Sequence, residues 1–210
     1  MRSAAVLLLC LLALTGCGSS DDGGQKAGGQ ESGSPESCGL LTDAQVAELA
    51  GQPVTQSRAT AVGSLPACLY MVENSDKVQV IDVPASEWSR ELPALLDLVE
   101  QSGVVNDPKT RDRFAAAREK LDAEGSLDDD AACAMFSDLL EIQGAPAGES
   151  QIVSFVPTRK QPSGVNAQTC TDGTYTSVQL QSAGLADADL DAVAKRVGTA
   201  LEAAHGAATD

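Results

Sequence analysis

One six-residue pattern occurs twice in the chain and constrains the fold more than any other feature. CGLLTD begins at Cys38 and CAMFSD begins at Cys133, and both read cysteine, any residue, two large apolar residues, Ser or Thr, then Asp. Each copy leads into a short helical pattern that ends at a glycine, Gly51 or Gly144, where a helix can stop. The repeat therefore predicts two halves that begin in the same way.

Three short strands and a closing helix follow each copy. Apolar residues at every second position are typical of strands, and a period near 3.6 is typical of helices. The predicted strands and closing helices are 54–60, 67–72, 77–83 and 87–101 in the first half, then 151–156, the residues around Cys170, 174–180 and 187–204 in the second. We therefore predict an α+β fold: an antiparallel sheet with helices packed on it, in two similar helix, three strands, helix halves at 38–103 and 133–205.

The first copy carries the stronger helix-start signal. Thr42 and Gln45 match a capping box, and Leu41 can pack on Val46 as a hydrophobic staple. In the second copy Ser137 is the candidate cap, but a leucine takes the place of the glutamine. We expect a well-defined helix start at Thr42 and a weaker one at Ser137.

A further helix is predicted between the halves, at 108–124. Asp107 suits its cap, Pro108 its first turn and Gly125 its end. The helix carries five of the 14 Lys and Arg of the chain, which form the main cationic cluster: Lys109, Arg111, Arg113, Arg118 and Lys120. Such a cluster can bind phosphate or carboxylate. The interleaved acidic residues favour the alternative, a solvated face of mixed charge.

The first 17 residues predict export and an anchor. Arg2 precedes an apolar run from Ala4 to Leu14, which is too short for a bilayer core that needs about 20 helical residues. The run ends in Leu-Thr-Gly-Cys at Cys17, and this segment resembles the bacterial lipobox. The resemblance implies that residues 1–16 are a signal peptide and that Cys17, acylated with a diacylglyceryl group of palmitate type, is the first mature residue.

The lipobox resemblance predicts a location. Two acyl chains on one residue hold a soluble body at a membrane stably. We expect the protein on the outer face of the cytoplasmic membrane, lipid-anchored and extracytoplasmic. The alternative is a plain secreted protein in which Cys17 is coincidental.

Residues 18–37 hold six Gly, five Ser and no large apolar side chain, so 17–37 is predicted to be the lipidated cysteine with a flexible linker.

The cysteines predict a disulfide framework. One of the six leaves with the leader and Cys17 carries lipid, so four remain in an exported body. An even number in an oxidising compartment predicts two disulfides, with three possible connectivities. If the halves are equivalent, Cys38 pairs with Cys68 and Cys133 pairs with Cys170. Each bridge would then contribute about 3–4 kcal/mol.

Charge excludes one class of partner. Without residues 1–16 the chain has 13 Lys and Arg against 30 Asp and Glu, a formal charge of −17. Phosphate backbones repel such a body, so we expect no nucleic-acid partner. No phosphate-binding loop, dinucleotide fingerprint or G-x-S-x-G elbow occurs in the sequence, and we expect no cofactor.

The sequence predicts no catalytic residue. His205 is the single histidine and lies near the end of the chain, where we expect a frayed helix terminus. The four body cysteines are expected to be oxidised, and every Asp and Glu that the sequence allows us to place is expected in a loop, at a helix end or on a polar helix face. General acid and base catalysis needs groups whose pKa is tuned toward neutrality by burial or pairing. The chain is therefore expected not to be an enzyme.

Two further groups of residues could suggest a ligand site, and for both we predict a structural role. Asp128, Asp129 and Asp130 lack the alternating oxygen ligands and the glycine of a calcium loop, so no metal site is predicted. Trp88 and Tyr70 are among only six aromatic residues, and we expect them in the core rather than stacked on a ligand.

Residues 38–70 of the chain, following a lipobox and a polar linker, resemble an actinobacterial lipoprotein family of unknown function. The resemblance lies in a cysteine, a Leu-Leu-Thr helix start, a glycine and a second cysteine beside an aromatic: Cys38, Leu40, Leu41, Thr42, Gly51, Cys68 and Tyr70. It implies an envelope location and brings no catalytic residues.

These observations predict a non-enzymatic binding or accessory module of the cell envelope. Its expected contacts are the membrane, through the lipid on Cys17, and an envelope protein or an apolar, lipid-like ligand between the halves. One alternative is a hydrolase of envelope material that uses carboxylates not identified in the sequence. Another is a structural surface protein. A deep apolar pocket would favour the binding module, and converging buried carboxylates would favour the hydrolase.

Overall fold

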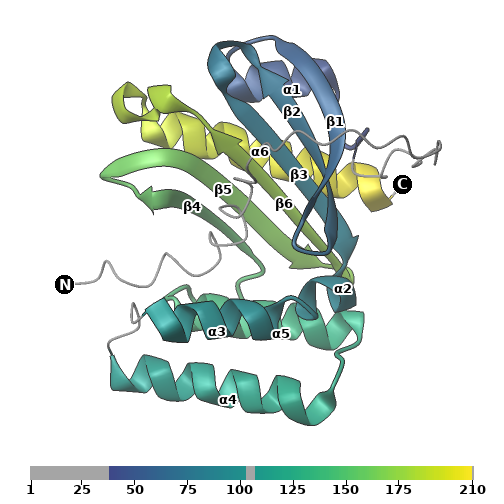
Figure 1. Ribbon diagram of the computed structural model, residues 1–210, viewed down its shortest axis with the longest axis vertical. Coiled ribbons are helices and arrows are strands. Elements are labelled where there is room, and N and C mark those ends of the chain that lie inside the picture. The colour runs from purple at the N-terminus through teal and green to yellow at the C-terminus, as the bar shows by residue number, and fades with distance from the viewer. Residues whose placement is uncertain (1–37, 103–106, 210) are drawn as a thin grey trace, which may run out of the picture.

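The computed structural model describes residues 38–102 and 107–209 (Figure 1). The predicted signal peptide at 1–16, the lipidation site Cys17 and the linker at 17–37 lie outside the described residues. Within the described residues, a single antiparallel sheet carries helices. The predicted α+β fold is confirmed.

The sheet has six strands in the order β1-β2-β3-β6-β5-β4, and every neighbouring pair is antiparallel. Two three-stranded meanders therefore lie side by side and join where β3 pairs with β6. The strands are β1 (Val54–Val62), β2 (Leu65–Val72), β3 (Lys77–Pro84), β4 (Gln151–Thr158), β5 (Gln161–Thr171) and β6 (Thr174–Gln181). All six predicted strands occur, and each is longer than predicted or equally long.

The helices form two groups. Figure 1 shows α1 and α6 behind the sheet, and α3 and α5 below it with α4 as the outermost helix. The helices are α1 (Asp43–Ala50), α2 (Ala85–Ser89), α3 (Leu92–Ser102), α4 (Pro108–Glu124), α5 (Asp129–Ile142) and α6 (Leu190–Thr209), with short 3-10 turns η2 (Glu73–Ser75) and η3 (Ala183–Asp187). Helix α4 is the predicted joining helix with its predicted bounds.

Helix α1 begins as predicted. The Thr42 side chain accepts a hydrogen bond from the Gln45 backbone N–H at 3.3 Å, and the Thr42 backbone N–H donates to Gln45 Oε1 at 2.8 Å. Leu41 and Val46 are both buried beside this capping box. Gly51 ends the helix with a φ of 72°, which favours glycine because it has no Cβ.

The second helix start was predicted in the wrong place. Helix α5 begins at Asp129, and the Asp128 side chain caps it by accepting a hydrogen bond from the Ala131 backbone N–H at 2.8 Å. Cys133 and Ser137 therefore lie inside the helix, where the Ser137 hydroxyl donates to the Glu149 carbonyl oxygen at 2.6 Å. Three acidic residues in succession stabilise this earlier start, because carboxylates both cap helix N–H groups and favour the positive end of the helix dipole.

Both closing helices also differ from prediction. The helix predicted at 87–101 is two helices, α2 and α3, and Pro93 lies in the first turn of α3, where its missing N–H does no harm. The helix predicted at 187–204 begins at Leu190 after η3. There the Asp189 side chain accepts hydrogen bonds from the backbone N–H groups of Asp191 and Ala192.

The structure confirms the predicted disulfide pairing. Cys38 bonds to Cys68 with a Cα to Cα distance of 4.9 Å, and Cys133 bonds to Cys170 with a Cα to Cα distance of 5.1 Å. Both distances lie in the usual range for disulfides. Each bridge ties a helical segment to the middle strand of its own meander.

The two bridges lie on opposite faces of the sheet. Cys68 is the register partner of Val80, which is the partner of Val178 on β6. Cys170 is the partner of Tyr175, three residues before Val178 on the same strand. Because side chains alternate between faces along a strand, an odd separation places Cys68 and Cys170 on different faces. We call the face with Cys68 the α6 face and the face with Cys170 the α5 face.

Each face has its own core. The α6 face packs under α1 and α6 and is mainly aliphatic, with the buried residues Val78, Val80, Val178, Leu180, Val193, Val197 and Leu201 among its members. The α5 face packs under α2 and α5 around three aromatic rings. Trp88 stacks on Tyr175 with ring centroids 5.0 Å apart and meets Phe136 edge-on at 5.5 Å. Trp88 and Tyr70 are thus core residues, as predicted.

Candidate functional site

A cavity of about 480 Å³ lies between α3 and α4. This volume is in the range of small-molecule sites in proteins, roughly 300 to 1,000 Å³. Its lining comes from both helices: Leu96 and Glu100 on α3, and Pro108, Arg111, Asp112, Phe114, Ala115 and Arg118 on α4. Apolar and charged side chains both contribute to the wall, so the cavity is amphipathic.

Helix α4 lies over this cavity with few buried residues of its own. Only Ala117 and Leu121 are buried among its described side chains, and Phe114 packs half-buried against the core of the α5 face. The Asp107 side chain caps the helix by accepting a hydrogen bond from the Thr110 backbone N–H at 2.8 Å. This bond and the one from the Thr110 hydroxyl lower the pKa of the Asp107 carboxyl. The helix start is therefore fixed while most of its length stays exposed.

Ion pairs join α4 to its two neighbours. Arg118 bonds to Asp97 on α3, and its Nε lies 3.8 Å from Oδ2 of Asp122 on α4 itself. The hydrogen bond to Asp97, more than any other effect, raises the pKa of Arg118. Arg113 lies 3.6 Å from Glu141 on α5. These contacts hold α4 beside α3 and α5 at its exposed sides, although solvent screening makes each exposed pair only weakly stabilising.

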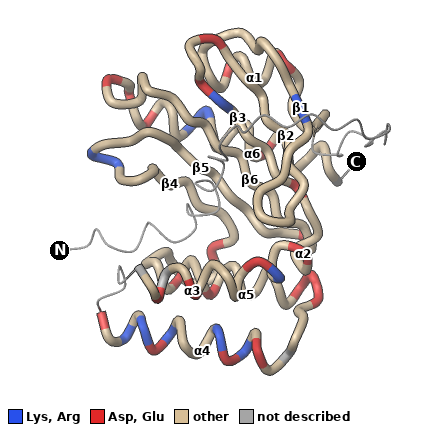
Figure 2. Tube along the Cα trace, in the orientation of Figure 1, with Lys and Arg blue, Asp and Glu red and all other residues tan. Residues whose placement is uncertain are grey.

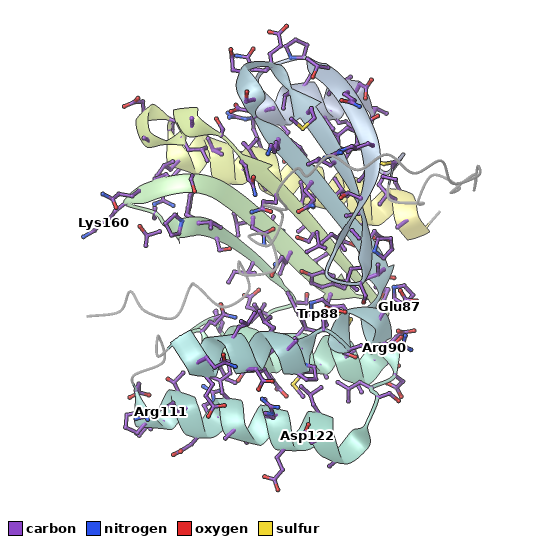
Figure 3. The ribbon with its side chains drawn as sticks, viewed as in Figure 1. Glu87, Trp88, Arg90, Arg111, Asp122 and Lys160 are labelled. Carbon is purple, nitrogen blue, oxygen red and sulfur yellow. A yellow bond between two sulfur atoms is a disulfide. The ribbon has the colours of Figure 1, made fainter. Side chains whose placement is uncertain are left out.

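The cationic cluster predicted on this helix is mixed with acidic residues, as the alternative interpretation expected. Figure 2 shows Lys and Arg alternating with Asp and Glu along α4. Figure 3 labels Arg111 near the start of the helix and Asp122 toward its other end. Arg111 and Arg118 line the cavity, whereas Lys109 and Lys120 do not. Part of the cluster thus contributes to the candidate site and part is solvated surface.

A second group of polar side chains lies on the α6 face and joins four distant residues. His205 Nε2 is 2.8 Å from the Thr171 hydroxyl, and His205 Nδ1 is 2.8 Å from the Thr176 hydroxyl. The Thr176 hydroxyl in turn donates to Asp82 Oδ2 at 2.6 Å. The expectation that His205 lies on a frayed terminus is wrong, because α6 extends past it and the ring is fixed to two strands.

The hydrogen bonds of this group determine where its protons lie. Thr176 has one hydroxyl proton, and Asp82 accepts it, so His205 Nδ1 must donate to Thr176. In the neutral imidazole, Nε2 then accepts from the Thr171 hydroxyl. Asp82 also corrects the expectation that all carboxylates lie in loops or on helix faces, because it is half-buried in the central strand β3.

The α5 face carries an amide-rich patch farther along its strands. Asn166 and Gln179 are buried there, and the Ser177 hydroxyl donates to Asn166 Oδ1 at 3.0 Å. The same face is apolar at the α5 end of the strands, where Ile81 and Tyr175 lie. The α6 face also changes along its strands, from the aliphatic core around Val80 and Val178 to the group of Asp82, Thr176 and His205. The two faces therefore differ in the polar groups they hold and in the helices that cover them.

The three successive aspartates serve the start of α5 and its contact with α2. Asp129 Oδ1 accepts a hydrogen bond from the Ser86 backbone N–H at 2.8 Å, and the hydrogen bonds with Ser86 lower the pKa of this carboxyl.

Among the described residues no group of three or more His, Cys, Asp or Glu side chains is placed to hold a metal ion. The same part of the chain has no helix long and apolar enough to cross a membrane.

Comparisons of the chain with protein-family models, with curated proteins and with solved structures find no match. The resemblance to the lipoprotein family over residues 38–70 stays a prediction.

The sequence located parts of the candidate site but did not bring them together. It predicted α4 and its cations, yet the cavity also needs Leu96 and Glu100 from α3, which the sequence placed inside one longer helix. The group around His205 was missed altogether. Once β3 and β6 are known to pair, strand alternation places Asp82 and Thr176 on the same face as Val80 and Val178. This alternation is the sequence feature that could have indicated the group.

Proposed function

We propose that this protein is a lipid-anchored, extracytoplasmic binding module of the cell envelope and that the cavity between α3 and α4 is its ligand site. The observation that carries the proposal is the cavity itself, about 480 Å³, with both apolar side chains such as Leu96 and Phe114 and charged side chains in its wall. Sites for small molecules are usually concave and largely apolar, with a few polar groups that orient the ligand. The lipobox resemblance and the polar linker support the location.

Binding rather than catalysis is supported by the state of the titratable groups near the core. Both nitrogens of His205 are engaged by threonine hydroxyls, and Thr176 gives its proton to Asp82 rather than to the histidine. Around the cavity, Arg118 is paired with Asp97 and Asp122. These groups are committed to holding elements together, and we propose that the module has no enzymatic activity.

A hydrolase is the second candidate, and one observation favours it. The order Thr171, His205, then Thr176 and Asp82 follows the order of nucleophile, base and orienting group in covalent catalysis. None of these four residues lines the described cavity. Replacing His205 with Ala and assaying the protein against envelope glycans, peptides and esters tests this candidate. Turnover by the wild-type protein that His205→Ala abolishes without unfolding it would replace the binding module by the hydrolase.

Native mass spectrometry of the protein purified from membranes tests the binding function. A retained small molecule that is lost from a Phe114→Ala variant is the expected result, because Phe114 lies on the cavity wall. Protein that carries only its own acyl groups, together with a failure of added amphiphiles to bind, would contradict the proposal and favour a structural surface protein.

The anchor has a separate test. Cys17→Ser removes the thiol that would carry lipid, so acyl labelling and removal of the leader should both be lost. Membrane fractionation alone is not sufficient, because a retained leader also binds membranes. Acyl labelling that persists in Cys17→Ser would contradict the anchor and leave the binding site untouched.

A further inference from the structure

Two arginines line the cavity, Arg111 and Arg118, and they differ in whether a carboxylate pairs with them. Arg118 is half-buried and bonded to Asp97, with Asp122 also within 4 Å. Both carboxylates are neighbours in the fold and compensate its charge. A ligand anion would have to compete with them. Arg118 is therefore a structural cation, and its pairing is complete without a ligand.

Arg111 is in the opposite state. It lies in the first turns of α4, is exposed and lines the cavity. Among the described residues, no carboxylate oxygen lies within 4 Å of its guanidinium nitrogens. At the start of the helix, the Asp107 side chain accepts the Thr110 backbone N–H, and its charge is attracted to Arg111 beyond the distance of an ion pair. Arg111 is the cation of this wall that can pair with an anionic group.

The rest of the wall limits the ligand further. Leu96 is buried and Phe114 half-buried, and with Pro108 and Ala115 they offer an apolar surface to a hydrocarbon chain. Glu100 and Asp112 line the same cavity and oppose a high negative charge on the ligand. An apolar chain with one negative charge matches both kinds of side chain in the wall.

We propose that the cavity binds a single-chain amphiphile with a monoanionic head group, and that Arg111 binds the head group while Leu96 and Phe114 contact the chain. This inference rests on the proposed function, because it assumes that the cavity is the ligand site. A carboxylate and a phosphodiester share the required chemistry. Guanidinium forms bidentate hydrogen bonds with either group.

The test uses the mature chain from residue 17, carrying C17S so that it needs no detergent and retaining every described residue. The probes are cis-parinaric acid, which is a fluorescent fatty acid, and its neutral methyl ester. The wild-type protein should bind the acid about tenfold more tightly than the ester, a difference of about 1.4 kcal/mol. Arg111→Gln should reduce the preference to about twofold or less, because only the head-group contact is lost.

Lys109→Gln is the matched control, since Lys109 is a cation on the same helix that does not line the cavity. It should leave the preference unchanged. Phe114→Ala should weaken the acid and the ester by the same factor, about tenfold, and so show that both bind in this cavity. Thermal unfolding of each variant checks that the fold is retained.

The outcomes separate the inference from the function on which it rests. Equal affinities for the acid and the ester, or equal effects of Arg111→Gln and Lys109→Gln, would overturn the head-group inference and leave the cavity as a site for neutral apolar ligands. No saturable binding of either probe would overturn both. Competition by lysophosphatidylglycerol would identify a phosphodiester head group, and its failure would identify a carboxylate. Stronger competition by dianionic lysophosphatidic acid would contradict the limit to one charge.

Discussion

The α1 region and the α5 region each contain a motif cysteine, a helix and a disulfide to the sheet, but they place them on opposite faces. In both, a cysteine of a repeated motif bonds to a cysteine on the middle strand of a meander. Cys38 lies before its helix and holds α1 on the α6 face, whereas Cys133 lies inside its helix and holds α5 on the α5 face. A repeated order of elements therefore does not require that the repeated elements share a face.

The described cavity lies among the helices of the α5 face. On the α6 face, α1 and α6 lie against the sheet, and Arg196 Nε of α6 donates to the Leu49 carbonyl oxygen of α1 at 3.3 Å. On the α5 face, α2 and α5 contact the sheet, and α3 and α4 add an outer layer whose packing leaves about 480 Å³ between them.

Removing the bridges singly tests whether they stabilise the two faces equally. The sequence separations are 30 and 37, so loop entropy predicts nearly the same cost, about 4 kcal/mol for each Cys→Ala pair. Chemical unfolding of Cys38→Ala with Cys68→Ala, and of Cys133→Ala with Cys170→Ala, measures both costs. A difference above about 2 kcal/mol would show that the bridges act through local packing of their faces and not through chain entropy.

The two hydroxyl residues of the repeated motif should also behave differently. Thr42 caps α1, so Thr42→Ala should cost about 1 kcal/mol, the usual value for a lost cap. Ser137 lies inside α5, and Ser137→Ala should cost about 0.5 kcal/mol or less, because alanine favours the helix and partly offsets the lost hydrogen bond to Glu149.

Asp128→Ala is the control for this comparison, since Asp128 is the observed cap of α5 and its loss should resemble that of Thr42. Denaturant midpoints of the three variants provide the measurement. If Ser137→Ala were as costly as Thr42→Ala while Asp128→Ala were neutral, α5 would begin at Ser137, and the two halves would be closer copies than the structure describes.

The smallest expected effect is a pH dependence confined to the α5 region. The hydrogen bonds with Ser86 lower the pKa of Asp129 below its ordinary 3.8. A lowered folded pKa stabilises the protein above the ordinary value, and that stabilisation is lost as the pH falls through the folded pKa. Asp129→Asn should therefore cost most near neutral pH, about 1 kcal/mol at most for a partly buried group, and progressively less as the pH falls below 3.8.

Asp130→Asn is the matched control, because Asp130 is an exposed neighbour in the same turn of α5. Its cost should be a few tenths of a kcal/mol, from the helix dipole alone. Unfolding free energies of both variants across the acid range provide the comparison. An Asp129→Asn cost that stays constant with pH would show that the contact with Ser86 does not depend on the carboxylate charge.

Local patterns were sufficient to predict the six strands, α1 and α4, because capping residues and strand alternation are properties of neighbouring residues. The disulfide pairs followed from the equivalence of the two halves. The sequence could also have predicted which face of the sheet Cys170 lies on. Val165 and Ala167 form one alternating set on β5, and Cys170 falls in the other set. An Asp-Gly pair at 172–173 marks the tight turn that follows.

The candidate site could not be predicted in the same way. The cavity depends on how α3 and α4 pack, and the exposed, highly charged sequence of α4 shows no strong apolar stripe that would fix its position. The group of Asp82, Thr171, Thr176 and His205 depends on strand pairing between residues almost 100 positions apart, since Asp82 and Thr176 are separated by 94. Long-range pairing of this kind leaves no local signal.

The most direct test of the account is amide chemical-shift mapping of the mature chain carrying C17S during titration with cis-parinaric acid. A ligand in the cavity should cause saturable shifts in α3 and α4, concentrated around Leu96, Arg111 and Phe114, and leave α1 and α6 unchanged. Saturable shifts centred on α1 and α6 would contradict it, because they would place the ligand site on the face that the structure describes as closed by two helices.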